Sequence, residues 1–406
     1  MVSERSCAKC GRMIPWGEKE CPLCSERRGY FWSLRRDTFL LSISLVLILL
    51  FVGTGFVVRS FHRTEARLAW DWNTRGDEAL KSGHPEAALV DFRNALFHSR
   101  DNPIYQLRLA QALGATGQLP QARTYLLNLR ERDPGNGTVN LELGRLAARE
   151  HDVSAALLYY HDAIYCEWEG DAVAQRRAVR LELFQFLVAS DQKETARAEL
   201  ITVAANLPPD PALQTKVGTL LLEVGGFDDA LRLFREAVAT SPRLALAWAG
   251  AGECYFKMGR YTQAQHYLQR AIFRDPHLAR AAAMLDTART VLSMDPFYPR
   301  LDQYSAAHRA THDINQAMTH LAGCAAQRGI DLSGQGTDQL HMLYAEVAAL
   351  KPRLRETDLQ RDPNLLPQVM DLVFGIEKTT AQVCGEPEGE DLALLLIARQ
   401  QEGAQP

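Results

Sequence analysis

The sequence lacks a surplus of positive charge, a long acidic run and the short motifs that mark many enzymes. Its 406 residues carry 45 Lys or Arg against 49 Asp or Glu, a formal net charge of −4. This composition does not indicate a nucleic-acid partner. There is no HExxH pair, no Gly-rich phosphate loop and no nucleophile elbow, and hardly any stretch alternates like a strand. We therefore predict an all-α protein that is not an enzyme.

Cysteine is scarce after the first 24 residues, and the four later cysteines stand singly without a recognisable spacing: Cys166, Cys254, Cys324 and Cys384. The other four form two CxxC pairs with ten residues between them: Cys7, Cys10, Cys21 and Cys24. That spacing suits a tetrahedral zinc site of four thiolates. So short a segment buries little core, so the metal would supply its folding free energy. A redox pair or disulfides are the alternative.

The stretch CAKCGRMIPWGEKECPLC resembles the short bacterial zinc-ribbon family. It has the Gly after the second Cys, the Ile-Pro before the connecting loop and the Cys-Pro-x-Cys ending. The resemblance implies a small ribbon over residues 1–28, with one structural zinc ion.

An uncharged run of 20 residues, Phe39 to Val58, contains 15 Leu, Ile, Phe or Val. As a helix it spans about 30 Å, the thickness of a bilayer's hydrocarbon core. We predict a single transmembrane helix over 39–58 that is kept as an anchor, because no small-x-small cleavage site follows it. Lys and Arg number five in the 20 residues before the run and four in the 20 after it, so charge does not decide the orientation. An unoxidised zinc site belongs in a reducing cytosol, which predicts a cytoplasmic N-terminus.

After the apolar run the sequence repeats itself with a period of 34 residues. Gly218, Leu221, Gly225, Ala230, Phe234, Ala237 and Pro242 recur as Gly252, Tyr255, Gly259, Ala264, Leu268, Ala271 and Pro276. Small residues at such positions allow two helices to approach closely, and Pro ends the second helix. The pattern, with Trp248, resembles the tetratricopeptide repeat family. We count six copies, over 69–102, 103–136, 137–170, 177–210, 211–244 and 245–278, and a capping helix from Ala279 to Leu292 completes a repeat domain over 69–292.

The family resemblance implies a right-handed superhelix whose concave groove is lined by the first helix of each repeat. On that template the groove would present ten residues of mixed charge: Asn73, Asp77, Gln111, Arg145, Arg149, Gln185, Thr215, Thr219, Glu253 and Phe256. A solvated helix face is the alternative for each of them. The expected ligand is a protein or a peptide. The Lys and Asn pattern with which some family members hold a C-terminal carboxylate is not present.

The last hundred residues keep helical periodicity without the 34-residue repeat. Three apolar faces, around Ile314, Leu343 and Val373, predict a helical domain over 300–401 that docks on the end of the repeats. His308 and His312 are four residues apart, with Asp313 and His320 nearby. A metal or catalytic site is one interpretation, but His320 lies about 80° around the helix from His312, which favours surface histidines.

Together these features predict a single-pass protein of a bacterial inner membrane. A cytosolic zinc ribbon would precede an extracytoplasmic repeat scaffold that binds proteins or peptides, in an assembly of the cell envelope. Two alternatives stay open. The C-terminal domain would be an enzyme or an enzyme-activating module in envelope or glycan assembly, or the zinc ribbon would be the main docking module in the cytosol.

Overall fold

The computed structural model describes residues 5–168, 170–334, 336–362 and 364–403, and at residues 26–38 it describes the helical backbone alone. The prediction of an all-α protein is confirmed, because the described residues form helices and turns and contain no β-strand. The chain divides into two compact units, Met1–Glu150 and His151–Pro406. The division lies inside the predicted repeat domain, within its third copy.

The first unit contains five helices in its described part: α1 (Pro22–Lys81), α2 (Pro85–His98), α3 (Pro103–Ala115), α4 (Leu119–Arg132) and α5 (Gly137–Arg149). Proline stands at the start of α1, α2 and α3, where its missing N–H costs nothing. The last turns of α1 pack against α2. There Gly76 faces the buried ring of Phe92, and a Cβ atom on Gly76 would lie 2.6 Å from that ring.

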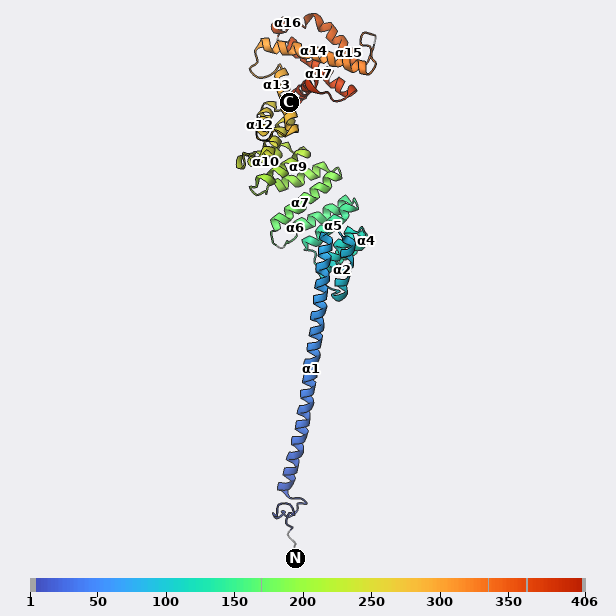
Figure 1. Ribbon diagram of the computed structural model, residues 1–406, viewed down its shortest axis with the longest axis vertical. Coiled ribbons are helices and arrows are strands. Elements are labelled where there is room, and N and C mark those ends of the chain that lie inside the picture. Colours follow the sequence, from blue (N-terminus) through green and yellow to red (C-terminus); the bar gives the residue numbers. More distant parts are fainter. Residues whose placement is uncertain (1–4, 169, 335, 363, 404–406) are drawn as a thin grey trace. The chain divides into compact units, whose positions relative to one another are not determined.

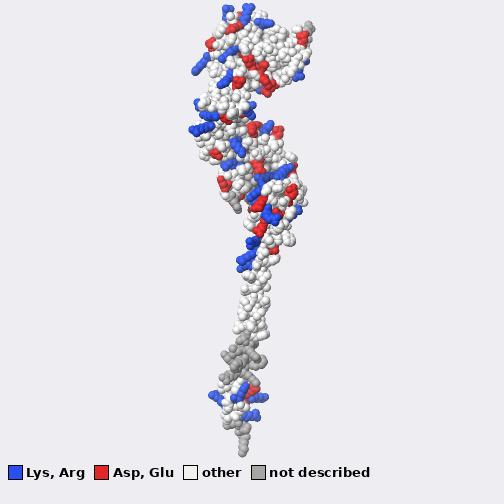
Figure 2. Space-filling model, in the orientation of Figure 1, with Lys and Arg blue, Asp and Glu red and all other residues white. Residues whose placement is uncertain are grey.

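Helix α1 is the longest element, and its middle carries the apolar run. All of the large apolar side chains from Phe39 to Val58 are at least 41% exposed, and no Lys, Arg, Asp or Glu interrupts them. Figure 1 shows α1 as the long helix before the repeats, and Figure 2 shows its uncharged stretch in white. Leaving so many large side chains in water costs roughly 1.5–3 kcal/mol for each. By length and composition, this is the one helix of the described chain that could cross a membrane.

The second unit begins with the remaining helices of the repeat region: α6 (Val153–Tyr165), α7 (Ala172–Ala189), α8 (Lys193–Ala204), α9 (Pro211–Glu223), α10 (Phe227–Thr240), α11 (Ala245–Lys257), α12 (Tyr261–Arg274) and α13 (Ala279–Met294). Gly252 of α11 packs on Leu268 of α12, where a Cβ atom would lie 2.7 Å from Leu268 Cγ. Gly259 forms the turn between these two helices, with φ of +71°. The small residues of the repeat therefore mark close helix contacts and turns.

The C-terminal helices of the second unit are α14 (Gln303–Gln327), α15 (Gln339–Leu350), the 3-10 turn η1 (Lys351–Arg353), α16 (Glu356–Arg361), α17 (Leu365–Cys384) and α18 (Gly389–Gly403). One apolar core joins them to Tyr261 of α12 and to Val291 of α13. The expected docking of this bundle on the end of the repeats is therefore present. Helix α18, which contributes Leu394 and Ile397 to this core, was not among the three predicted apolar faces.

Candidate functional site

The four N-terminal cysteines are close enough to bind one ion. Cys7 Sγ lies 3.9 Å from Cys24 Sγ, and Cys10 Sγ lies 3.7 Å from Cys21 Sγ. All four sulfur atoms are within 4.8 Å of one another. In a tetrahedral zinc–thiolate site with Zn–S bonds of about 2.3 Å, neighbouring sulfur atoms are about 3.8 Å apart. The four residues therefore fit a zinc ion. Residues 1–4 of the predicted ribbon lie outside the described residues.

Local backbone geometry positions these cysteines. Gly11 donates its N–H to the carbonyl of Cys7 over 2.8 Å, with φ of +71°, which closes the first CxxC turn. Cys21 is the N-cap of α1, so Cys24 lies in the first turn of that helix. The backbone N–H groups of Lys9 and Cys10 lower the pKa of Cys7 to about 7. This favours the thiolate form, which is the metal-binding form.

We expect a peptide of residues 1–28 to bind one zinc ion and to lose it when Cys21 is changed to Ser. Three thiolates and a hydroxyl hold zinc far less well than four thiolates, and the peptide has little core to fold around. Metal analysis of peptides prepared with reductant measures this directly, and Ser25→Ala, just outside the cluster, is the control. A wild-type peptide without zinc would contradict the assignment.

Three of the predicted groove residues of the first unit, Asp77, Gln111 and Arg145, are linked through two residues that were not predicted, Arg108 and Glu142. Asp77 forms an ion pair with Arg108 Nε over 3.2 Å, and Arg108 also donates to Gln111 Oε1. Gln111 Nε2 and Arg145 Nη1 both donate to Glu142 Oε1, over 2.9 and 2.8 Å. The network links α1, α3 and α5. It leaves Arg145 with 41% of its side chain exposed.

Two further predicted groove residues in this unit behave differently. Asn73 is half-buried, and its Oδ1 atom is buried without a hydrogen-bond partner among the described residues. Arg149 is exposed, and its Nη1 donates to the carbonyl of Gly114 over 2.5 Å, across to the end of α3. Of these five positions in the first unit, Arg145 and Arg149 are those most open to a ligand's acidic groups.

The predicted groove residues of the second unit differ in how exposed their side chains are. Gln185 and Thr219 are exposed, whereas Thr215 is buried and donates its hydroxyl to Pro211 O over 2.7 Å. Glu253 is 9% exposed and forms an ion pair with Arg280. Phe256 packs against the C-terminal core, which α18 helps to form. Thr215, Glu253 and Phe256 are therefore less open to a ligand than the prediction assumes.

A cavity of about 440 Å³ lies among α6, α7 and α8 of the second unit. Three arginines of α7 line it, Arg176, Arg177 and Arg180, beside Tyr165 and Val173. The side chains of Tyr165 and Val173 are 72% and 61% exposed, so the cavity combines positive charge with open apolar surface.

The charges in this cavity are only partly neutralised by ion pairs with the chain's own acids. Arg180 donates to Glu199 over 2.5 Å and lies 5.8 Å from the ring centre of Tyr165. Arg176 instead donates to a neutral group, the carbonyl of Cys166. The sequence pattern did not predict this cavity, because the three helices that line it come together only in the fold. Helix α7 also begins at Ala172, with Asp171 as its cap, five residues before the predicted start of the fourth copy. The spacing of Arg176 and Arg180, one helical turn apart, was the available signal.

The histidines of α14 are not all on the surface. His308 and His312 are more than half exposed, as expected, with side chains 69% and 51% accessible. His320 is only 16% exposed and lies 2.7 Å from Glu377 Oε2, so the surface interpretation is wrong for this residue. The hydrogen bond to Glu377 raises the pKa of His320, and burial raises the pKa of Glu377. Asp313 of the predicted group is fully buried.

Parts of the repeat region are similar in sequence to known proteins. The tetratricopeptide repeat family model matches residues 79–140 and 221–286. These two stretches are tetratricopeptide repeats. A 62-residue segment of the chain is 39% identical to Superkiller protein 3 of Schizosaccharomyces pombe. That match covers 15% of this chain and only 4% of the length of the yeast protein.

Solved structures with similarity to the chain include other proteins with tetratricopeptide repeats. YrrB, a TPR protein with an unusual peptide-binding site, is 21% identical, with coverage of 47% of this chain and 95% of YrrB and a TM-score of 0.36. PilF of Pseudomonas aeruginosa is 14% identical, with coverage of 54% and 97% and a TM-score of 0.37. PilW, a type IV pilus biogenesis factor, is 16% identical, with coverage of 53% and 98% and the same TM-score of 0.37.

Proposed function

We propose that this chain is a membrane-anchored tetratricopeptide scaffold that binds segments of other proteins in an assembly of the bacterial cell envelope. The observation that carries the proposal is α1, in which the exposed apolar run of residues 39–58 continues without a break into the first helix pair of the repeats. An anchor that is continuous with the first repeat would tether the repeats to the membrane. The proposed location is the inner membrane.

The oxidation states of the cysteines support a cytoplasmic N-terminus and extracytoplasmic repeats. Cys7, Cys10, Cys21 and Cys24 are free thiols arranged for zinc, which a reducing compartment favours. Cys324 of α14 and Cys384 of α17 form a disulfide, which persists in an oxidising compartment. The two groups of cysteines lie on opposite sides of the apolar run in the sequence. This is the arrangement expected if the run crosses a membrane.

The cavity on α7 supports binding of acidic segments that also carry an apolar side chain. Arg176, Arg177 and Arg180 supply charge-assisted donors for carboxylates, and Tyr165 supplies an apolar surface that a Leu or Phe of a ligand can cover. Stacked helix pairs leave extended surfaces of this kind free for ligands. The role of these repeats would therefore be recognition and not catalysis.

The test uses the full chain in detergent and two sets of immobilised synthetic peptides. One set combines Asp or Glu with Phe or Leu, and the other has Lys in place of the acids. We expect the acidic set alone to bind, and Arg176→Glu with Arg177→Glu to weaken it at least tenfold, because each lost charged contact contributes about 1.5–3 kcal/mol.

The variant Arg145→Glu with Arg149→Glu tests the predicted groove in the first unit by the same measurement. Helicity by circular dichroism must be unchanged in both double variants. Lys193→Glu serves as a single charge-reversal control, because its exposed side chain pairs with the exposed Asp191. Equal binding of acidic and basic peptides, or unchanged binding by both double variants, would contradict the proposed recognition.

A further inference from the structure

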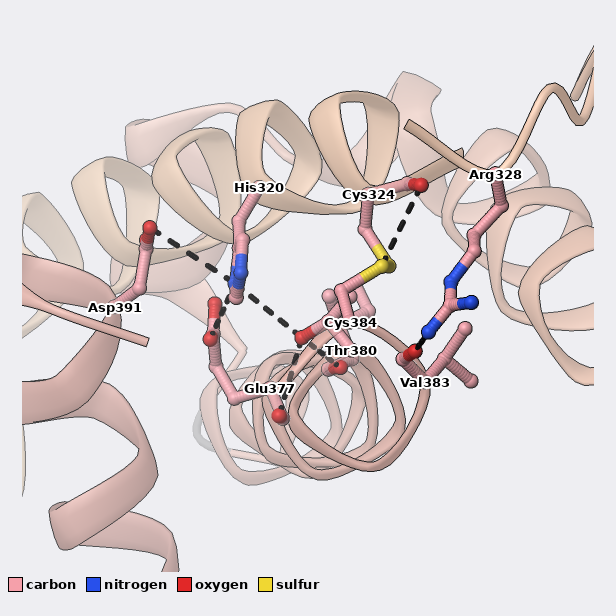
Figure 3. The surroundings of a disulfide bond; sticks show 9 residues. His320, Cys324, Arg328, Glu377, Thr380, Val383, Cys384 and Asp391 are labelled. Atoms are coloured by element: carbon pink, nitrogen blue, oxygen red, sulfur yellow. Dashed lines mark hydrogen bonds and ion pairs between the residues drawn. A yellow bond between two sulfur atoms is a disulfide. The ribbon is translucent and has the colours of Figure 1, made fainter. Parts of the chain in front are cut away.

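Three side chains from three helices meet at one point in the C-terminal bundle. His320 comes from α14, Glu377 from α17 and Asp391 from the first turn of α18 (Figure 3). The Glu377 side chain is 0% exposed, and those of His320 and Asp391 are 16% and 19% exposed. The cluster is therefore mostly buried, and the Glu377 carboxylate is fully enclosed.

The cluster holds more acceptors than its own donors satisfy. His320 Nδ1 lies 2.7 Å from Glu377 Oε2 and 3.9 Å from Asp391 Oδ2, so a single imidazole faces two carboxylates. Gln316 donates to the other oxygen of Asp391 over 2.9 Å. Glu377 Oε1 is buried with no hydrogen-bond partner among the described residues. Burying such an acceptor without a partner is unfavourable, and more so when the group is charged.

A cation at this point would satisfy both the orphaned oxygen and the surplus of negative charge. The imidazole nitrogen and the two carboxylate oxygens lie within 4.8 Å of one another. Ligand atoms that bind one zinc ion at about 2.1 Å and at a tetrahedral angle are about 3.4 Å apart. The observed separations of 2.7 and 3.9 Å lie on either side of that value. Small rotations of side chains would therefore bring all three onto one ion.

We propose that His320, Glu377 and Asp391 form a second metal site, which binds one divalent transition-metal ion of the zinc class. One nitrogen and two oxygen ligands suit Zn²⁺ and, more weakly, Mn²⁺, whereas the four sulfurs of the N-terminal cluster suit Zn²⁺ and exclude harder ions. Three protein ligands leave a fourth position for water or for a group of a bound partner.

The fold holds two of the ligands in place before any metal binds. The Cys324–Cys384 disulfide joins α14 to α17, and Cys324 follows His320 by one helical turn, as Figure 3 shows. Thr380 Oγ1 lies 3.2 Å from His320 Nδ1 and also donates to the carbonyl of Ile376, which fixes it on α17. Preorganised ligands lose little conformational freedom when they bind an ion.

The test measures zinc binding to the full chain in detergent, without reductant, in a Cys21→Ser background that removes the thiolate site. We expect one zinc ion per chain, measured by competition with a chelator of known affinity. Glu377→Gln and Asp391→Asn, made separately, should each weaken binding at least tenfold. His308→Asn is the matched control, since this exposed histidine of α14 lies outside the cluster and should leave the affinity within twofold.

Asp391→Asn keeps the test decisive if Glu377→Gln disturbs folding, because Asp391 lies at the exposed edge and its amide analogue keeps its size. Hydrogen exchange in α17 should also slow on adding zinc to the Cys21→Ser chain, and not in the Asp391→Asn variant. Absence of bound zinc, or the same affinity in all three variants with the disulfide intact, would overturn the proposal and assign any binding to adventitious surface groups.

Discussion

Removing the Cys324–Cys384 disulfide should destabilise the C-terminal bundle by about 4 kcal/mol. The bond closes a loop with a sequence separation of 60 residues, and chain-entropy arguments assign about that stabilisation to a loop of this length. The bond also joins α14 and α17, whose packed side chains form much of the core of this region. In the double variant Cys324→Ala with Cys384→Ala, these two helices should therefore open far more often than in the wild type.

Hydrogen exchange in α14 and α17 measures this effect helix by helix. A loss of about 4 kcal/mol corresponds to exchange roughly a thousandfold faster wherever opening of the bundle limits it. Cys166→Ala is the control, because Cys166 is not part of the disulfide and lies at the end of α6. Unchanged protection in the double variant, or a non-reducing digest in which Cys324 and Cys384 are not linked, would contradict this account of the bundle.

The second large effect concerns Asp313, whose carboxyl group is buried in the same bundle. Its side chain is 0% exposed and neither oxygen has a hydrogen-bond partner among the described residues. Burial raises the pKa of Asp313 to about 8, with Arg309 acting in the opposite direction and Asp295 and Glu390 adding to the increase. Folded Asp313 therefore keeps its proton at pH values where the unfolded residue, with a pKa near 3.9, has lost it.

The sign of the pH dependence follows from this difference in bound protons. The contribution of the Asp313 carboxyl group to the free energy of unfolding is fully present below about pH 4. It is lost as the pH rises towards the folded pKa of about 8. Asp313→Asn replaces the carboxyl with a neutral amide of similar size, so the loss at high pH should disappear. At pH 8 we expect the variant to be more stable than the wild type, on the order of 5 kcal/mol, because the two pKa values of Asp313 differ by about four units.

Hydrogen exchange in α14 between pH 5 and pH 8, corrected for the intrinsic exchange rate, reports this stability. Asp371→Asn on the exposed face of α17 is the matched control and should follow the wild type. If Asp313→Asn were no more stable than the wild type at pH 8, the buried carboxyl would not be neutral in the folded protein.

Much of the helical framework follows from local sequence. Each of the six predicted copies contains two helices, as the Gly or Ala at close contacts and turn residues such as Gly259, which recur at fixed spacing, predict. The start of α7 was misplaced by five residues because Asp171, its cap, lies before the point at which the repeat spacing resumes. Helix α18 was missed because its run of Leu and Ile is apolar on every side and has no helical period.

The disulfide and the pair of His320 with Glu377 in the C-terminal bundle could not be predicted from the sequence, for a different reason. Cys324 and Cys384 are 60 residues apart, and no local spacing marks them as partners. Glu377 and His320 are likewise brought together only by the packing of α17 on α14. The N-terminal cysteines were predictable as a group, since two CxxC turns with a short connection place all four thiols together whatever the rest of the chain does.

We propose that the apolar run of α1 separates a reducing compartment from an oxidising one, and protease accessibility on its two sides tests this topology. The full chain, with an epitope tag at each end, would be produced in bacteria, and spheroplasts of these cells would be treated with an added protease. We expect the repeats and the C-terminal tag to be digested, while the N-terminal tag and the cysteine segment are protected until the membrane is lysed. Protected repeats with a digested N-terminal segment, or recovery of the intact chain in the soluble fraction, would contradict it.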